Sequence, residues 1–472
     1  MNNKNYIFIL IVLYISQLFP CTIGIIRADL TNNQRPLIWK SRDSSAMNIS
    51  PIYNLSGVNP YVGIISNSVY DRVWMGVNVR GFAMLNSLSL DLQGTNSSGN
   101  GQFIAHCLAN YSTITELENY LNETNDLGRA TKGNFAVIDG LGNGAMYEIA
   151  NNDWVKYDVN DDNECPEGFI IRTNFSFTGG SLNGIDRYNR AYNQIETLLS
   201  ENLINVENIK NELIRDFSIN SNEAYDVPFL GDTFGYQGYI NIDNSICNET
   251  TTNATIIEGI LNSEDIPIMW NINGFPVVTP IVPYIPRYFN DNMQSIIDLT
   301  QQIKYLLMDI EYFQTLLNTN YFIQDDNQGI WDILDNYDYN TIQNFYQEYE
   351  DTSFSFNNYI ISKNLDIYYK LNSIKNSLIV TPVDDVNVLF KNSNITVYPN
   401  PAKDNINIKI DYCFENIFNI EIFNIKGQKK YTGVYDKLTA TIPLMNNLNS
   451  GVYVVKVYDE RKTFYTKFLK IK

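Results

Sequence analysis

Between position 21 and about position 288, groups of strand-like segments alternate with pairs of helix-like segments. The first strand group covers 21–28, 36–43, 61–67, 72–78 and 81–87, with turn-forming Gly, Pro and Asn between its members. Helical patterns follow at 103–111 and 114–123, and a second strand group lies at 134–140, 144–151, 153–159 and 168–174. Two more helices within 184–216 and strands at 238–242, 254–260 and 266–270 complete the region. This order predicts an α+β fold in which helix layers cover stacked antiparallel sheets, a four-layer αββα sandwich.

The bulk composition sets broad limits on function. The chain has 472 residues, enough for one large domain and a smaller one, and 44% of them are hydrophobic, as in globular proteins. The formal charge of −19 argues against broad nucleic-acid binding, which needs a basic surface. An acidic balance fits an exported protein but selects no substrate.

The first twenty residues have the pattern of a signal peptide. Lys4 supplies a basic start, and the apolar run from Tyr6 to Leu18 is shorter than a comfortable membrane span. We expect residues 1–20 to be removed, by a signal peptidase or by the enzyme itself, so that the mature chain begins at Cys21. A lipid on Cys21 is the alternative, although Pro20 makes a poor acceptor site.

A chain that begins with cysteine carries a thiol and an α-amino group on one residue. The amine can take the thiol proton, so the residue is nucleophile and base at once. The other cysteines, Cys107, Cys165, Cys247 and Cys413, form no metal-ligand spacing, although some could form a disulfide in an oxidising compartment. We expect the single histidine, His106, to be structural, and no metal or organic cofactor is predicted.

The region from Cys21 to Trp270 resembles the N-terminal nucleophile (Ntn) hydrolases of the choloylglycine hydrolase, acid ceramidase and isopenicillin-N acyltransferase-like group. Cys21-Thr22 matches the mature N-terminus of that group. Asp43, at the end of Lys40-Ser41-Arg42-Asp43, matches the aspartate that hydrogen-bonds the α-amino group. Relatives often carry an arginine three residues before this aspartate, where this chain has Lys40. Whether Lys40 or Arg42 lies beside the thiolate therefore stays open.

The same resemblance supplies three further candidates. Asn86 ends a Gly76–Asn86 segment similar to the strand-turn-strand that contributes a side-chain amide to the oxyanion hole. Asn174, after Arg172-Thr173, matches the second oxyanion asparagine, and Arg187 matches an arginine near the nucleophile. The resemblance implies attack of the Cys21 thiolate on an amide carbonyl, with a thioester intermediate. Segments 245–248 and 269–276 also resemble this group but receive no assigned role.

The last 75 or so residues resemble the type A sorting domain of type IX secretion substrates. The matching residues are Tyr398–Pro401, the Phe423–Gly427 turn, Leu448–Tyr453 and the basic end Lys467–Lys472. The resemblance implies a small β-sandwich, recognition by the type IX machinery, and a secreted or cell-surface protein exported through the periplasm. A carbohydrate-binding sandwich is the alternative for this tail.

These patterns divide the chain into five parts. They are a signal peptide at 1–20, a catalytic domain at 21–288, a helical extension at 289–378, a linker at 379–395 and the sorting domain at 396–472. The leading hypothesis is a secreted enzyme that cleaves a linear, non-peptide C–N amide bond of a small molecule, or transfers its acyl group. A dipeptidase with an N-terminal cysteine and a non-catalytic surface-binding protein are the alternatives.

Overall fold

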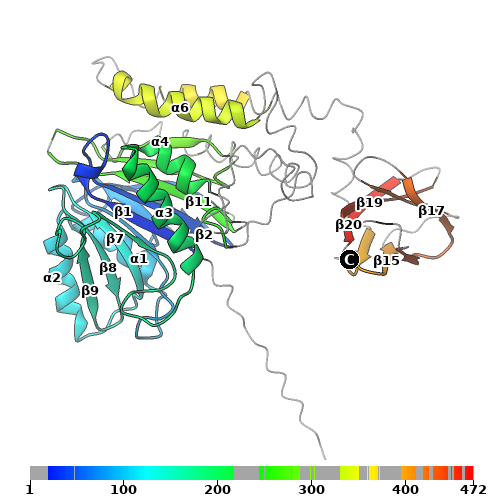
Figure 1. Cartoon of the computed structure of the whole chain (residues 1–472), viewed down its shortest axis with the longest axis horizontal. Helices are drawn as coiled ribbons and strands as arrows, with labels where there is room; N and C mark the ends of the chain where they lie inside the picture. The colour runs from blue at the N-terminus through cyan, green and yellow to red at the C-terminus, as the bar shows by residue number, and fades with distance from the viewer. Residues whose placement is uncertain are drawn as a thin grey trace, which may run out of the picture. The chain divides into compact units, whose positions relative to one another are not determined.

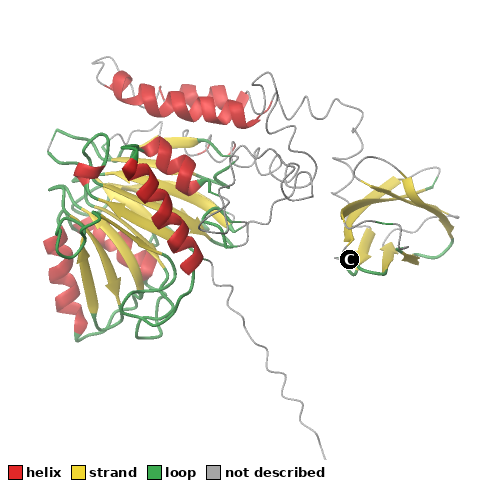
Figure 2. Cartoon of the chain, in the orientation of Figure 1, coloured by secondary structure: helices red, strands yellow, loops and turns green. Residues whose placement is uncertain are grey.

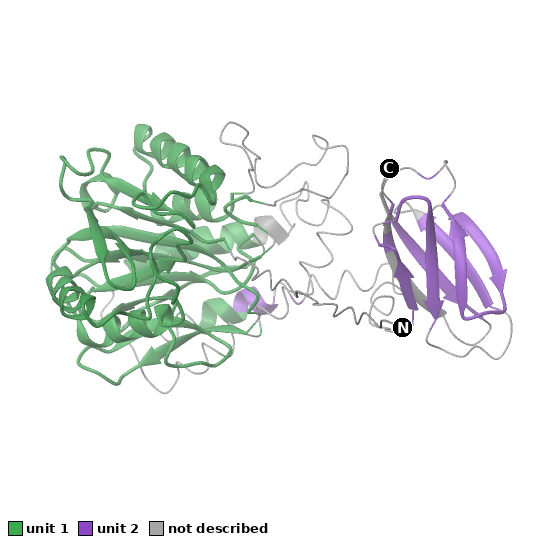
Figure 3. Ribbon diagram, turned by 90° about the horizontal axis from the view of Figure 1, so that it is seen from below, with its two compact units in different colours: residues 1–228, 241–308, 333–365 green, residues 229–240, 309–332, 366–472 purple. Residues whose placement is uncertain are grey.

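The computed structural model describes most of the catalytic region and much of the tail. The described residues are 20–46, 48–216, 244–248, 250–262, 264–277, 279–287, 330–349, 361–369, 395–400, 402–410, 418–424, 429–444, 451–459 and 463–470, with the single residues 298, 302, 359, 372 and 448. The chain divides into two compact units, one of residues 1–228, 241–308 and 333–365, the other of 229–240, 309–332 and 366–472 (Figure 3).

The first sheet of the larger unit carries the start of the predicted mature chain. Its strands are β1 (Thr22–Ile26), β2 (Leu37–Asp43), β10 (Phe169–Arg172), β11 (Thr251–Glu258), β12 (Ile268–Ile272) and β13 (Ile281–Tyr284). They run in the order β10-β1-β2-β11-β12-β13, and every neighbouring pair is antiparallel. All seven residues of β2 are buried, including its four polar ones, Lys40 to Asp43. Burying so many polar groups is costly unless they serve a purpose.

The second sheet lies against the first. Its strands are β3 (Ile49–Asn54), β4 (Tyr61–Ser66), β5 (Met75–Asn78), β6 (Ala83–Ser87), β7 (Gly133–Ile138), β8 (Gly144–Ile149) and β9 (Trp154–Asp158), in sequential order. Every neighbouring pair in this sheet is antiparallel, and α1 (Asn100–Asn110) and α2 (Ile114–Asn125) lie in the connection between β6 and β7. β1 and β2 pack across the interface against β6 and β7.

Helices cover the outer face of each sheet. On one side lie α1 (Asn100–Asn110) and α2 (Ile114–Asn125), and on the other α3 (Ile185–Ser200), α4 (Val206–Ile209) and a π-helical turn, Lys210–Ile214. A short 3₁₀ turn spans Ala28–Leu30. α2 begins with a reciprocal capping box formed by Thr113 and Glu116.

The resulting unit is the predicted four-layer αββα sandwich (Figures 1 and 2). One apolar cluster fills the space between the sheets and under α3, and includes Ile23, Ile25, Val62 and Met75. A second packs α1 and α2 on the other sheet through Phe103, Leu117 and Phe135 among others. Each fully buried large apolar side chain contributes about 1.5–3 kcal/mol.

The sequence patterns missed two strands, β3 and β13. Each contains a proline, Pro51 and Pro283, which lacks the N–H that an internal strand needs. Both strands lie at the edge of their sheet, where one side requires no partner. The strand expected at 238–242 lies outside the described residues.

The predicted helical extension is represented by α6 (Ile330–Tyr349) and by helical residues 361–369. Asp338 on α6 is fully buried and accepts bonds from Arg215 Nη2 at 2.7 Å and Lys210 Nζ at 3.3 Å. Its other oxygen accepts the Ile281 N–H at 2.9 Å. One carboxylate therefore joins α6 to the π-helical turn and to β13.

The described tail is a small sandwich of two antiparallel sheets, as predicted. Its strands are β14 (Ile395–Tyr398), β15 (Asn405–Ile410), β16 (Phe418–Asn424), β17 (Lys429–Tyr435), β18 (Thr439–Pro443), β19 (Gly451–Tyr458) and β20 (Thr463–Lys470). The sheets have the orders β14-β15-β18 and β17-β16-β19-β20. Ile406, Ile420 and Val455 are among the residues of their shared core.

Candidate active site

Cys21 lies directly before β1 and is 8% exposed. Its backbone N–H donates to Asn174 Oδ1 at 3.1 Å, and its Sγ lies 4.0 Å from the backbone oxygen of Asp43. β1 pairs with β10 on one side and β2 on the other, so residues from both neighbouring strands surround the thiol. Because Cys21 precedes the first residue of β1, its N–H donates to the Asn174 side chain and not to a neighbouring strand.

Arg187, near the start of α3, fixes the backbone around Cys21. Its Nη1 donates to the Cys21 carbonyl at 2.7 Å and to Thr22 Oγ1 at 2.9 Å, and its Nη2 donates to Asn174 Oδ1 at 2.9 Å. Burial lowers the pKa of Arg187, while Asp43 and Cys21 oppose that shift. Arg187 thus contacts both the candidate nucleophile and the neighbouring asparagine.

Asn174 is held by both ends of its amide. Its Oδ1 accepts from Cys21 and Arg187, and its Nδ2 donates to the Leu88 carbonyl at 2.8 Å. This pattern assigns the orientation of the amide, because the oxygen faces two donors. One hydrogen of Nδ2 is left for another acceptor.

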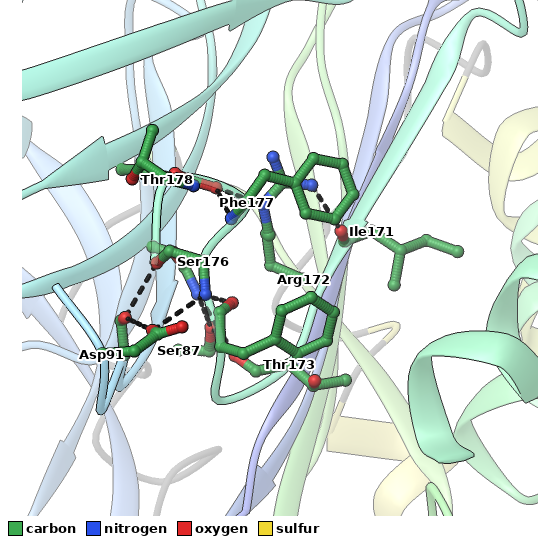
Figure 4. Close-up of polar contacts among 12 residues, drawn as sticks. Ser87, Asp91, Ile171, Arg172, Thr173, Ser176, Phe177 and Thr178 are labelled. Atoms are coloured by element: carbon green, nitrogen blue, oxygen red, sulfur yellow. Dashed lines mark hydrogen bonds and ion pairs between the residues drawn. The ribbon is translucent and has the colours of Figure 1, made fainter. Parts of the chain in front are cut away.

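Figure 4 shows how the loop carrying Asn174 is fastened to the second sheet. Ser87 Oγ donates to the Thr173 carbonyl at 2.5 Å, and the Ser176 N–H donates to Asp91 Oδ1 at 3.0 Å. The Arg172 guanidinium lies over the Phe177 ring at 3.5 Å. These contacts tie the end of β10 to the end of β6, where Asn86 lies.

Beside this loop, at the edge strand β10, lies a cavity of about 550 Å³. Aromatic and charged side chains line it, including Tyr157, Phe177, Tyr188, Glu164 and Arg172.

Asp43, the last residue of β2, is 5% exposed and held by two residues that the sequence reasoning left without a role. Asn248 Nδ2 donates to Oδ2 at 2.7 Å, and Thr251 Oγ1 donates to Oδ1 at 2.5 Å. Burial raises the pKa of Asp43 to about 7, against the opposing effects of Arg187, Thr251, Asn248 and Arg42. The 245–248 segment noted in the sequence contains Asn248, but only the β2–β11 pairing, which places Thr251 opposite Asp43, brings this region to the carboxylate.

Lys40 and Asn86 form a contact between the two sheets. Lys40 Nζ donates to Asn86 Oδ1 at 3.0 Å and to the Trp74 carbonyl at 3.1 Å. Burial lowers the pKa of Lys40 to about 7, and Cys21 is the largest opposing influence. Because Lys40 occupies the amide oxygen of Asn86, the amide nitrogen is turned toward other acceptors.

Arg42 also lies by the nucleophile. Its Nη2 donates to Ser66 Oγ at 2.9 Å, and its guanidinium carbon lies 5.2 Å from the centre of the Trp74 ring. Burial lowers its pKa to about 10, with Cys21 the largest opposing influence. The choice between Lys40 and Arg42 that the sequence left open is therefore not exclusive, since both interact electrostatically with Cys21.

The structure thus gathers all the predicted site residues in one place: Cys21, Lys40, Arg42, Asp43, Asn86, Asn174 and Arg187. The expected contact between the Asp43 carboxylate and the Cys21 nitrogen is replaced here by the Cys21–Asn174 bond. In this chain that nitrogen is still an amide joined to Pro20. The roles of these residues stay predictions.

Other features lie apart from this cluster. His106 is on the outer helix α1, where it contacts Tyr111 and Asn110. Cys21, Cys107 and Cys165 are free thiols, and Cys413 lies outside the described residues. Among the described residues, no three His, Cys, Asp or Glu side chains form a group that could hold a metal. Over the same residues, no helix combines the length and apolar character of a membrane span.

Comparison with known families identifies the tail. Residues 396–472 match the family model of the secretion system C-terminal sorting domain. The predicted sorting domain is thereby confirmed, and with it a secreted or cell-surface location and engagement of the type IX machinery.

One curated relative is an ulvan lyase from Nonlabens ulvanivorans, 29% identical over 161 residues. The match covers 33% of this chain and 28% of the relative, so the chain spans under a third of that protein's length.

Three solved structures are similar to this chain. Penicillin V acylase from Agrobacterium tumefaciens is 16% identical, with 56% of this chain and 86% of that chain covered and a TM-score of 0.35. A variant of conjugated bile acid hydrolase from Clostridium perfringens is 12% identical (57% and 93% covered, TM-score 0.35). The Caenorhabditis elegans orthologue of N-acylethanolamine-hydrolyzing acid amidase is 16% identical (56% and 100% covered, TM-score 0.34).

Proposed function

We propose that the larger unit is a cysteine amidohydrolase or acyltransferase of the N-terminal nucleophile type, acting on a linear, non-peptide C–N amide bond of a small molecule. The observation that carries the proposal is the setting of Cys21. Arg187 holds its carbonyl, Asn174 holds its nitrogen, and Lys40 and Arg42 place positive charge near its thiol. No such convergence is needed for a cysteine that only fills a core.

Removal of residues 1–20 is part of the proposal. It converts the Cys21 amide nitrogen into an amine whose unperturbed pKa is about 7.7–8.0, so that a base form exists near neutral pH. The amine can carry three hydrogens and needs more acceptors than an amide. Asn174 supplies one, and the ionised Asp43 carboxylate is the nearest anion along β2.

In the proposed reaction, the amine takes the thiol proton and the thiolate attacks the substrate carbonyl. The C–S bond forms and the C–N bond breaks, and the leaving amine takes a proton. Free N–H groups on Asn86 Nδ2 and Asn174 Nδ2 suit the developing oxyanion, a contribution of about 2.7–4 kcal/mol for one such donor. Water then cleaves the thioester to acid and thiol, or a second amine takes the acyl group.

The division of the chain follows from this reading. We assign 1–20 to the signal peptide, 21–288 to the catalytic domain, 289–378 to its helical extension, 379–395 to a linker and 396–472 to the sorting domain. No cofactor enters the proposed chemistry.

N-terminal sequencing and intact mass of the secreted protein test the proposal first. A chain starting at unmodified Cys21 that hydrolyses N-acyl amides, with activity abolished in Cys21→Ala and kept in the matched control Cys165→Ala, supports it. Preference for dipeptides would favour the dipeptidase alternative. A lipid on Cys21, or a start elsewhere, removes the base and contradicts the mechanism.

A further inference from the structure

Polar side chains form a row that leads away from Cys21 across the first sheet. Asn253 on β11 pairs directly with Arg42 on β2. Asn273 follows the last residue of β12, and the Ala254–Ile272 pair places it opposite Asn253. Cys21, in turn, lies one residue beyond the Thr22–Ser41 pair, opposite Arg42. Paired residues share a face, so Cys21, Arg42, Asn253 and Asn273 lie side by side.

This row is buried and its hydrogen bonding is incomplete. Arg42 is 6% exposed, Asn253 0% and Asn273 1%. Several of their buried polar atoms, and the indole nitrogen of the neighbouring Trp74, have no hydrogen-bond partner among the residues that the structure describes. These atoms are Arg42 Nη1, Trp74 Nε1, Asn253 Nδ2 and Oδ1, and Asn273 Nδ2 and Oδ1. Buried polar groups are nearly always paired, and one left unpaired costs about 1–3 kcal/mol. Six such atoms beside a candidate nucleophile could form hydrogen bonds with a bound ligand.

The chemistry of the row selects an anion. Four of its six unpaired atoms are N–H donors, and one of these belongs to a guanidinium. The guanidinium of Arg42 belongs to the row itself, although the whole chain has a net charge of −19. An arginine N–H with neighbouring amide donors is a suitable partner for a carboxylate.

We propose that Arg42, Asn253 and Asn273, with Trp74, bind a carboxylate at the far end of the substrate's acyl group. The inference rests on the proposed amide chemistry at Cys21, and it names the substrate class. The acyl group is chosen because it stays on Cys21 as the thioester, whereas the amine must leave. A buried row of polar side chains is therefore better suited to binding the acyl group than the amine.

The spacing sets the length of the acyl group. Neighbouring strands lie about 4.8 Å apart, so Arg42 is about one such step from Cys21 along the row. About three or four methylene groups place the two carbonyl carbons roughly 5–6 Å apart, which matches the step from Cys21 to Arg42. The expected substrates are therefore amides of short dicarboxylic acids, of which glutaryl amides are the simplest probe.

Glutaryl p-nitroanilide and pentanoyl p-nitroanilide test the proposal with the secreted full-length protein. They share leaving group and chain length and differ in the terminal carboxylate. We expect kcat/KM to be at least tenfold higher for the glutaryl substrate. Arg42→Met should remove that preference, whereas Arg80→Met, at an exposed arginine, should keep it. Equal losses for both substrates would mean that Arg42 acts only on the thiolate, and would overturn the proposal.

Binding of glutarate, followed by calorimetry, separates this proposal from the proposed function. Binding that weakens at least tenfold in Arg42→Met and in Asn253→Leu supports the carboxylate site even if no amide is cleaved. Melting curves of each variant identify any loss of folding, and Asn273→Leu replaces a variant that does not fold. If the protein cleaves neutral amides but does not bind glutarate, the proposed function stands and the carboxylate site is refuted. In that case internal water alone fills the row.

Discussion

The contact between Lys40 and Asn86 allows a sharp test of how the site works. Lys40 Nζ holds the amide oxygen of Asn86 at 3.0 Å, so the amide nitrogen faces away from the lysine. If Asn86 Nδ2 is an oxyanion donor, Asn86→Leu should lower kcat by about 100- to 1000-fold, or about 2.7–4 kcal/mol. Lys40→Met should lower it by a smaller factor, because a hydrogen bond to a charged group is worth about 1.5–3 kcal/mol.

The double variant decides whether Lys40 acts through Asn86. A positioning residue has little left to do once its target is gone, so adding Lys40→Met to Asn86→Leu should cost about threefold or less. The assay is kcat on the best amide substrate for the wild type, both single variants and the double variant. If the free-energy losses of the two single variants add up to that of the double variant, to within about 0.5 kcal/mol, the positioning role is refuted. Lys40 would then act directly on the thiolate.

The same lysine carries a signature in stability. Its pKa is about 7 in the folded protein and 10.5 in the unfolded reference, so between those values the unfolded chain binds more protons. Its contribution to the free energy of unfolding therefore rises with pH across that window, is fully present above pH 10.5, and is lost as pH falls through about 7. The difference in melting temperature between wild type and Lys40→Met should follow this sign. A difference independent of pH would contradict the buried, weakly basic state of Lys40.

Two further changes probe other parts of the larger unit. Asp338→Ala should destabilise it by about 3–5 kcal/mol, because Lys210 and Arg215 then lose a buried carboxylate partner, and chemical denaturation measures this loss. A loss of unfolding free energy under about 1 kcal/mol would show that the ion pairs of Asp338 are not effectively buried. Thr251→Val removes the hydrogen bond that lowers the pKa of Asp43, so the acid limb of kcat/KM should move to higher pH. An unchanged acid limb would exclude Asp43 as the titrating group.

Much of this fold could be predicted from the sequence, because its signals are local. Alternating apolar residues and turn residues marked most strands, and the helical patterns at 103–111 and 114–123 marked α1 and α2. The missed strands were those with prolines, Pro51 and Pro283, where the local signal argues against a strand and only the edge position permits one. Edge position depends on the order of strands in the sheet, which no local pattern contains.

The candidate site was predictable as a set of residues and less so as a set of contacts. Resemblance supplied Cys21, Asp43 and Asn174, and the structure brings them together. The support of Asp43 by Asn248 and Thr251 depends on β11 pairing with β2 across more than two hundred residues of sequence. The row from Arg42 to Asn273 depends on register, because a shift of one residue would turn these side chains to the other face.

The bonds that Arg187 and Asn174 make to Cys21 exist while Pro20 is still attached. In the proposed mechanism, the leader then blocks the amine that serves as the base, and Arg187 and Asn174 already contact Cys21 before cleavage. Cutting one peptide bond would unmask the amine without any rearrangement of β1. The enzyme would stay silent until the leader is cleaved, with two of the contacts around Cys21 already made.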